Sequence, residues 1–386
     1  MNNAKTGFWD KFLNNSKSNQ GTWSARAKTL LVLGGTAEQQ RDLVKNLHIE
    51  AENVTINNRF FGNTRAEKNR FVPEIGVSEA FLGYSYIEYR DDIDSKVLTS
   101  FLNLYTFPGE FLPEKAIFLH QFAKVDPMDL FVIILTPTGQ NIAKNINLEE
   151  LLITRRDLAR WINCVRDLFK DVSKDIFIQQ HAVSKMDYSD IASFPVSVRQ
   201  LPSGLDQGEC SDPLGCNLMI LVTDSDKHGQ DRFGSTILNA SEVEMFQQCL
   251  RVICLNHGAS LAFLPDSPSE ENYAPVLRAI NRAISLKIHT LLGEKANTLP
   301  QPALDSYENI FVPAGWDSWG KISSNDEFDC SAVSRMWEEL LMRENGENND
   351  QILHSRDEAL LEHPRSVFND FLQGIYEKQQ SRIALS

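Results

Sequence analysis

The chain of 386 residues lacks the features that mark several classes of protein. Its six cysteines form no C-x-x-C pair and no cluster with histidine, so their spacing does not suit zinc and favours free thiols in a reducing cytosol. The longest apolar runs, such as 130–135, are far shorter than the ~20 residues of a membrane-spanning helix. The polar start predicts no signal peptide. We therefore expect no bound metal and no direct membrane contact.

An excess of positive charge is also missing. Lysine and arginine number 38 against 52 aspartate and glutamate residues, which gives a formal net charge of −14. Without a basic stripe to release counterions, the chain is not expected to bind nucleic acid. With 42% hydrophobic residues it can nevertheless bury a substantial core. These values predict a globular cytoplasmic protein.

Short β-rich runs alternate with helical patterns along the chain, which is typical of a mostly parallel sheet covered on both faces. The runs that predict strands are Thr29–Leu33, Phe101–Phe107, Leu130–Leu135, Asn217–Val222 and Ser260–Leu264. The patterns that predict helices are Ala37–Leu47, Glu114–Phe122, Leu148–Asp171, Ser241–Asn256 and Ala274–Leu292. The third helix has the clearest apolar stripe, at spacings of three and four. Arg156 and Arg160 are expected opposite that stripe and Arg155 and Arg166 at its margin, so the arginines are expected to form a solvent-exposed face.

The stretch "LLVLGGTAEQQRDLVKNL" (30–47) has the order of a phosphate-binding loop, because a strand-like run ends in Gly34-Gly35 and leads into helix formers. In the pattern G-x-x-x-x-G-K-S/T, the last three positions fall at Gln39, Gln40 and Arg41. Gln40 carries no charge for a phosphate, and losing such a charged hydrogen bond costs roughly 1.5–3 kcal/mol. Arg41 cannot ligate Mg²⁺. The stretch is therefore either a strand-turn-helix that never bound nucleotide or a loop that has lost its chemistry.

Two further loops of a Ras-like sheet are also altered. A D-x-x-G after the second predicted strand would hold Mg²⁺, but the register gives Thr106 at the aspartate and keeps Gly109. An N/T-K-x-D would read guanine after the strand at 217–222. Here Thr223 and Asp226 keep the outer positions, and Asp224 replaces the lysine. Phosphoryl transfer depends on these groups, so we predict no enzyme activity and no cofactor. A weak purine site around Asp226 stays open.

The fold prediction follows from these patterns. We expect an α/β, Ras-like (P-loop GTPase-like), mostly parallel sheet with helices on both faces, plus N- and C-terminal helical extensions. Aromatic alternation in "LGYSYIEYR" predicts an additional strand at the sheet edge. After residue 300 we expect loops and acidic patches, including "RENGENND" (343–350), before one terminal amphipathic helix. The expected division is a segment 1–28, a domain 29–300 with inserts near 62–100 and 173–216, and an extension 301–386 that packs on the domain; the second insert is expected to be a long loop with one helix.

Apolar side chains outside the sheet are candidates for binding a partner. Two short amphipathic helices are predicted, one near each end, and each can pack either on its own domain or on a partner. Two tryptophans in a loop beside Pro313 either seal the edge of the core or bind a partner. The candidates are Phe8, Trp9, Phe12, Leu13, Trp316, Trp319, Phe368, Phe371, Leu372 and Ile375.

Several stretches resemble one family. "NIFVPAGWDSWGKI" (309–322) closely resembles the F-I/V-P-A-G-W-D signature of cytoplasmic dynein light intermediate chains. "GFWDKFLNNSKS" resembles their N-terminal segment, "TLLVLGGTAEQQRDLVKNL" their degraded or intact P-loop, and "LGYSYIEY" their L-G-Y-x-Y strand. "DEFDC" and "SVFNDFLQGIYEKQQ" look like the end of their folded domain. The resemblance spans about residues 7 to 380.

This resemblance implies a Ras-like pseudo-GTPase domain, a non-catalytic subunit of the dynein motor that binds the heavy-chain tail in microtubule-based transport. In the family, a further C-terminal region recruits cargo adaptors, and we expect it to be absent from this sequence, which stops at Ser386. The implied location is the cytoplasm, on the microtubule cytoskeleton. The alternative is a guanine-nucleotide-binding switch with residual GTP or GDP binding.

Overall fold

The computed structural model describes residues 26–50, 82–90, 98–137, 148–189, 205–224, 240–265, 268, 270–284, 301–305, 309–323 and 328–361. These residues form a seven-stranded sheet in the order β2-β3-β1-β4-β5-β6-β7. The strands are β1 (Arg26–Gly34), β2 (Gly83–Arg90), β3 (Leu98–Phe107), β4 (Leu130–Pro137), β5 (Asn217–Thr223), β6 (Ser260–Phe263) and β7 (Phe311–Val312). The strands from β3 to β6 in this order are parallel, whereas β2 and β7 pair antiparallel at the two edges.

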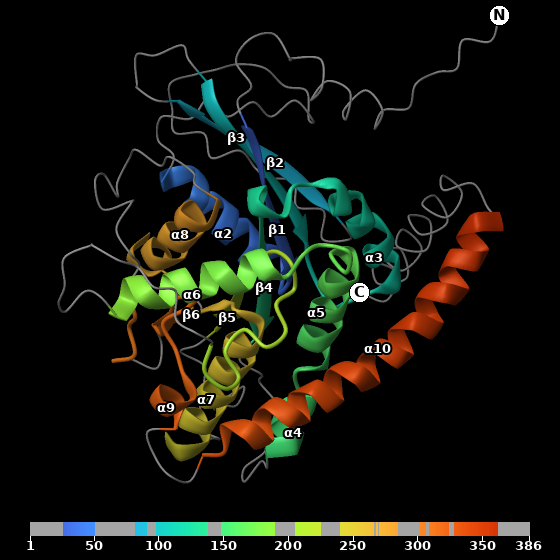
Figure 1. Cartoon of the computed structure of the whole chain (residues 1–386). Coiled ribbons are helices and arrows are strands. Elements are labelled where there is room, and N and C mark those ends of the chain that lie inside the picture. The colour runs from blue at the N-terminus through green and yellow to red at the C-terminus, as the bar shows by residue number, and fades with distance from the viewer. Residues whose placement is uncertain are drawn as a thin grey trace, which may run out of the picture.

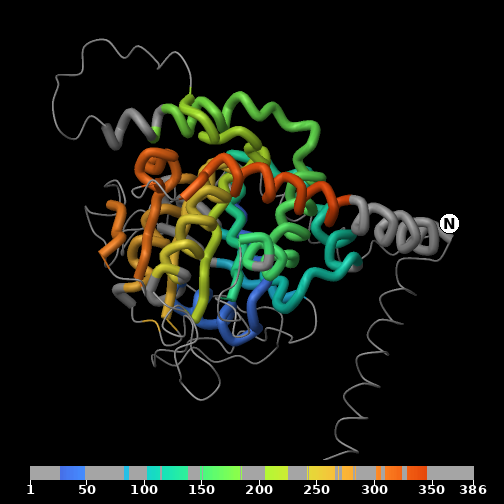
Figure 2. The backbone as a smooth tube through the Cα atoms, turned by 90° about the horizontal axis from the view of Figure 1, so that it is seen from below, coloured from blue at the N-terminus to red at the C-terminus, as the bar shows by residue number. Residues whose placement is uncertain are grey.

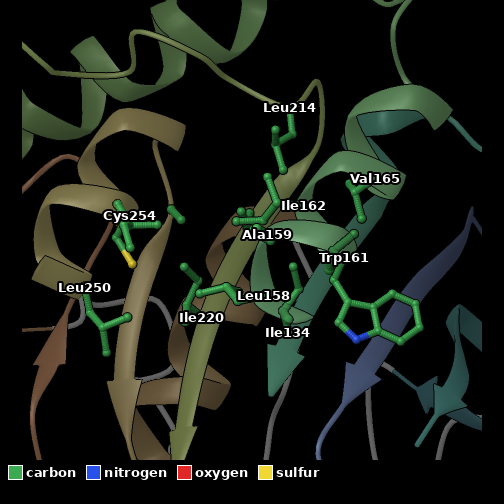
Figure 3. Close-up of a cluster of buried hydrophobic side chains, with 14 of the residues drawn as sticks. Ile134, Leu158, Ala159, Trp161, Ile162, Val165, Leu214, Ile220, Leu250 and Cys254 are labelled. Atoms are coloured by element: carbon green, nitrogen blue, oxygen red, sulfur yellow. The ribbon is translucent and has the colours of Figure 1, made fainter. Parts of the chain in front are cut away.

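Both faces of the sheet are buried, so β1 reads as a continuous apolar run rather than an alternating one. Leu31 and Leu33 belong to the core on one face, and Leu30 and Val32 belong to the core on the other. The first face is covered by α3 (Pro113–Leu119), α5 (Arg156–Leu168) and α7 (Ala240–His257), and the second by α2 (Ala37–Glu50) and α8 (Glu270–Ile284) (Figure 1). Figure 3 shows side chains of α5 and α7 meeting those of β4 and β5. The predicted Ras-like α/β fold and the edge strand β2 are confirmed.

Helix α10 (Cys330–Leu361) forms a further layer outside the first face. It contacts α5, α7, α3 and α4 (Leu148–Ile153), and Figures 1 and 2 show it crossing the body obliquely. The remaining helices are α6 (Asp175–Ser189), α9 (Trp319–Ile322) and two short 3₁₀ helices, η1 (His120–Lys124) and η2 (Pro127–Asp129). None of the described helices has an apolar stretch long enough to cross a membrane.

The single helix predicted over 148–171 is wrong, because the chain turns between α4 and α5. Thr154 Oγ1 donates to Leu151 O (2.6 Å), and Arg155 N donates to Leu152 O (2.8 Å), so the turn is closed locally. It directs Arg155 inward, where the guanidinium bonds Thr136 Oγ1 (3.2 Å) and the carbonyl of Pro137. Burial lowers the pKa of this guanidinium to about 10.

The predicted solvent-exposed arginine face is therefore wrong in part. Arg155 is buried, with 3% of its surface exposed. Arg156 and Arg160 bind the buried carboxylate of Glu344 on α10, and Arg166 binds Asp212. Arg156 and Arg160 keep 43% and 26% of their side-chain surface exposed, but both are engaged by α10 of the same chain.

The loops predicted after residue 300 are also wrong over 330–361, which forms α10. The helix begins after Asp329, whose Oδ1 accepts from Ser331 N (2.9 Å) and Ala332 N (3.0 Å). Its buried side chains recur at helical spacing: Val333, Trp337, Leu340, Leu341 and Glu344. The one helix expected in the second insert is confirmed as α6, whereas the two predicted terminal amphipathic helices lie outside the described residues.

Candidate functional site

The turn after β1 keeps the backbone of a glycine loop. Gly34 and Gly35 have φ values of 75° and 65°, a left-handed region that favours glycine. A Cβ on Gly34 would lie 2.7 Å from Leu135 O and 3.3 Å from Trp161 Nε1. The turn is thus fixed by close packing against β4 and α5, which requires glycine whether or not a ligand binds.

The residues that would form the phosphate loop instead begin a helix. α2 starts at Ala37, so Gln40 is its fourth residue and its N–H donates to Thr36 O (3.1 Å). Gln39 N donates to Thr36 Oγ1 (3.1 Å), and Thr36 N donates to Gln39 Oε1 (2.8 Å). This reciprocal pair is a capping box of the form T-x-x-Q. Three amides that would face a phosphate are therefore bonded within the chain.

The side chain at the lysine position folds back under the turn. Gln40 is fully buried, and its Nε2 donates to Gly34 O (2.6 Å) and Val32 O (3.3 Å). Its Oε1 has no hydrogen-bond partner among the described residues. Arg41, at the position of the hydroxyl, is exposed. Neither side chain is arranged to bind a phosphate or Mg²⁺.

The first loop is joined directly to the loop after β5. Gln39 Nε2 donates to Asp224 Oδ2 (3.0 Å), and Asp224 has a left-handed φ of 59°. Thr223 is buried at the end of β5, whereas Asp226 lies outside the described residues. The Gln39–Asp224 contact thus connects the two loops between which a nucleotide would have to lie.

The loop after β3 also bonds to the first loop. Gly109 has a φ of 85°, and its N–H donates to Gly35 O (2.7 Å). Thr106, at the position of the Mg²⁺-binding aspartate, is buried, and its Oγ1 has no hydrogen-bond partner in the described part of the chain. The structure therefore brings together Gly34, Gly35, Gln39, Gln40, Thr106 and Gly109 at the carboxyl ends of the parallel strands. There the first loop is hydrogen-bonded to the loop after β5 and to the loop after β3.

Sequence reasoning missed two residues at this site, Lys115 and Trp161. Lys115 on α3 is 2% exposed, and its Nζ donates to Pro108 O (2.5 Å) and Glu110 O (2.8 Å). The same ammonium lies 5.8 Å from the centroid of the Trp161 ring. Figure 3 shows Trp161 within the buried cluster of α5. Nothing local in "PEKAIFL" distinguishes this lysine from a solvent-exposed one, so only the fold reveals it.

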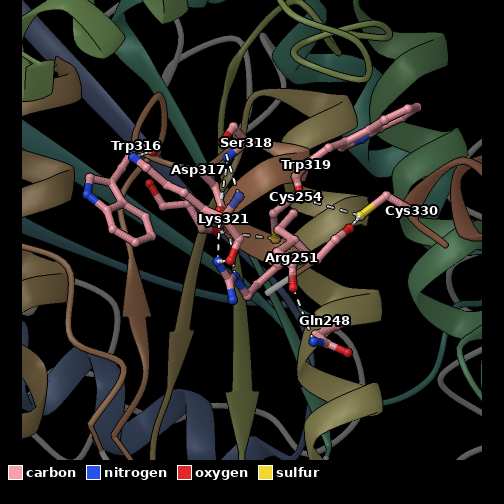
Figure 4. Close-up of polar contacts among 12 residues, drawn as sticks. Gln248, Arg251, Cys254, Trp316, Asp317, Ser318, Trp319, Lys321 and Cys330 are labelled. Atoms are coloured by element: carbon pink, nitrogen blue, oxygen red, sulfur yellow. Dashed lines mark hydrogen bonds and ion pairs between the residues drawn. The ribbon is translucent and has the colours of Figure 1, made fainter. Parts of the chain in front are cut away.

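The two candidate tryptophans after β7 pack on their own domain, while the other eight partner-binding candidates lie outside the described residues. Trp316 and Trp319 are partly buried against the core. Lys321 Nζ lies 4.1 Å from the centroid of the Trp316 ring. Trp319 lies so close to Gly208 that a Cβ there would be 2.1 Å from its Nε1. Figure 4 shows this loop bonded to α7. A partner role for either tryptophan stays a prediction.

The described residues show neither a cluster of metal-ligating side chains nor an activated cysteine. In the part of the chain that the structure describes, no three His, Cys, Asp or Glu side chains are placed to hold a metal ion. The six cysteines are free and buried. Burial raises the pKa of the Cys210 thiol to about 12 and that of Cys254 well above its ordinary value, so neither is activated as a nucleophile.

Comparison with known proteins adds a likeness of fold. No protein-family model matches the chain, and no curated protein matches it. Among solved structures, it resembles one described as "Crystal Structure of the Dynein Light Intermediate Chain's Conserved Domain". The two share 24% sequence identity with a TM-score of 0.54, and the match covers 82% of this chain and 91% of the other. The predicted resemblance is confirmed at the level of fold: the chain has the Ras-like α/β fold of that domain.

Proposed function

We propose that this protein is a non-catalytic subunit of the cytoplasmic dynein motor, which binds the heavy-chain tail and links it to cargo adaptors in microtubule-based transport. The likeness to a dynein light intermediate chain domain over 82% of the chain supports this assignment. A location in the cytoplasm, on the microtubule cytoskeleton, follows from it. Function then resides in surfaces carried by a rigid α/β platform rather than in a pocket.

The observation that carries the non-catalytic part is the bond from Gln40 Nε2 to Gly34 O, at 2.6 Å. The buried side-chain amide of Gln40 donates a hydrogen bond to this backbone carbonyl, as is usual for buried polar groups. The capping box and the Gln39–Asp224 contact bond the neighbouring groups in the same way. A phosphate would have to break several of these bonds while finding no charged partner at position 40. Partner binding is therefore proposed to be independent of nucleotide.

The test is co-purification with a dynein heavy-chain tail fragment, in EDTA and after removal of any nucleotide. A stable complex is the expected result. A complex that forms only after Mg²⁺ and guanine nucleotide are restored would instead support a nucleotide-dependent switch. No complex under either condition would contradict the assignment to dynein.

A pair of matched variants tests the N-terminal candidates in the same assay. Phe8→Ser with Phe12→Ser removes two members of the apolar stripe, and we expect it to weaken the complex at least about tenfold, in line with the loss of aromatic anchors. Asn14→Ser with Asn15→Ser changes the same segment without touching the stripe and should leave binding unchanged. Equal binding by both variants would exclude this segment from the interface.

A further inference from the structure

The segment after β3, Pro108–Leu119, corresponds to a part of nucleotide switches that changes order with the bound nucleotide. In such switches the γ-phosphate and its Mg²⁺ hold this loop, and hydrolysis releases it. In this protein the N–H of Gly109 donates to Gly35 O, at 2.7 Å. A backbone carbonyl of the first loop therefore receives the bond that would otherwise be available to a phosphate.

Lys115 holds the same segment from its buried side. Its ammonium bonds Pro108 O (2.5 Å) and Glu110 O (2.8 Å), the two carbonyls that flank Gly109. Charged donors make stronger hydrogen bonds than neutral ones, and burial keeps water from competing for these carbonyls. The lysine is 2% exposed, so the turn around Gly109 is closed by a cation within the protein.

Trp161 connects this lysine to the first loop. The ammonium lies 5.8 Å from the centroid of the indole ring, and the ring nitrogen lies 3.3 Å from the place of a Cβ on Gly34. Phe111 packs edge-on against the same ring, with centroids 5.1 Å apart. The segment after β3, α5 and the turn after β1 thus meet at one buried aromatic side chain.

We propose that Lys115 is a positioning residue that holds Pro108–Leu119 in a single conformation without nucleotide. Because α10 contacts α3, the same residue also supports the part of α10 that packs on α3. The surface made by α3 and α10 is then displayed permanently instead of in response to GTP. This inference concerns the domain itself and stands or falls independently of the heavy chain.

Hydrogen exchange on the full chain, read peptide by peptide, tests the inference. In the wild-type protein, the amides of 109–119 should exchange slowly in EDTA, with rates unchanged by Mg·GTP or Mg·GDP. In Lys115→Met, they should exchange about 10- to 100-fold faster, together with the part of α10 that contacts α3, because a charged buried bond is lost. The strands should keep their wild-type rates.

Lys28→Met is the matched control. Lys28 is also buried and forms an ion pair with Asp129. It lies near the start of β1, at the opposite end of that strand from the Gly34 turn. Its loss should lower overall stability without selectively accelerating 109–119. Should Lys115→Met fail to fold, Lys115→Gln carries the same test with a smaller expected factor. Wild-type rates in 109–119 of the Lys115 variant, or protection of that segment that appears only with Mg·GTP, would overturn the inference.

Discussion

The guanidinium of Arg251 on α7 donates two hydrogen bonds, each 2.8 Å long, to the carboxylate of Asp317 in the loop after β7. The side chains are 10% and 5% exposed. A third bond runs from Arg251 to Lys321 O, at 3.2 Å. A bidentate ion pair is therefore among the bonds that attach the loop with both tryptophans to α7 (Figure 4).

Asp317→Asn should destabilise the protein by roughly 3–5 kcal/mol, because it leaves a buried guanidinium without its counter-charge. Unfolding in urea, followed by tryptophan fluorescence, measures the change. Asp305→Asn, at an exposed position, is the control and should shift the free energy of unfolding by no more than ~0.5 kcal/mol. Equal stability of the two variants would contradict a structural role for the ion pair.

Glu344→Gln should loosen α10. The carboxylate is fully buried and accepts from Arg156 Nε (2.7 Å) and Arg160 Nε (2.8 Å). The arginine side chains are 43% and 26% exposed and can recover water, so the expected loss is roughly 1–3 kcal/mol rather than the full cost of a buried unpaired charge. Limited proteolysis should cut α10 sooner in this variant.

Glu338→Gln, at an exposed position on the same helix, is the control for that experiment. It should be digested at the wild-type rate. If Glu344→Gln were also digested at the wild-type rate, the two arginines would not be what holds α10 on the domain.

Gly34→Ala should destabilise the domain by about 1–3 kcal/mol or more, because alanine is strained at a φ of 75° and its Cβ would collide with Leu135 O. Gly320→Ala in α9 should be neutral or slightly stabilising, since nothing lies within 4 Å of its Cβ position. Thermal unfolding of both variants checks this contrast. A tolerated Gly34→Ala would mean that the turn is looser than the packing indicates.

His257 should make stability depend on pH. Its Nε2 accepts from Trp337 Nε1 (3.0 Å), so its Nδ1 donates to Asp212 O (2.8 Å). Burial lowers the pKa of His257 to about 4, although the Asp212 carboxylate favours the protonated form. The unfolded chain takes up a proton near pH 6.5. Stability is therefore complete above about pH 6.5 and is lost as the pH falls toward about 4.

Between pH 7 and pH 5 this residue should account for about 2 kcal/mol of lost stability. Urea unfolding at both pH values measures it. In His257→Gln the difference between the two pH values should shrink by that amount, whereas His120→Gln, at an exposed position, should keep the wild-type difference. An unchanged pH dependence in His257→Gln would show that the imidazole does not titrate as its burial implies.

Strands β1, β4, β5 and β6 could be predicted from the sequence because each contains an apolar run, and β2 could be predicted from its aromatic alternation. The two-residue β7 was not predicted. The missing charges of the first loop were equally readable at Gln40 and Arg41. The inward turn of Gln40 was not, since an amide at that position could equally have faced solvent. It depends on the position of the Val32 and Gly34 carbonyls, which accept from Gln40 Nε2.

The sequence contains signals for helix α10, but a polar stretch within the helix made them hard to recognise. Asp329 precedes a spacing of Val333, Trp337, Leu340 and Leu341 that fits one helical face, but the following "RENGENND" reads as an acidic loop. Its second residue is Glu344, whose burial is compensated by ion pairs with two arginines that are distant in sequence. Pairs of this kind cannot be recognised from one sequence, and the same holds for Lys115 and for the contact between Gln39 and Asp224.

The central claim is that the polar groups of the first loop, with which a nucleotide would have to form hydrogen bonds, are already hydrogen-bonded within the chain. Titration calorimetry of the nucleotide-free protein with Mg·GTP and with Mg·GDP tests it most directly. The account predicts no saturable binding of either nucleotide by the wild-type chain, and no GTP turnover after Gln40→Lys and Arg41→Thr, because Thr106 still lacks the carboxylate. Stoichiometric binding by the unmodified chain, or Mg²⁺-dependent GTP hydrolysis, would contradict it.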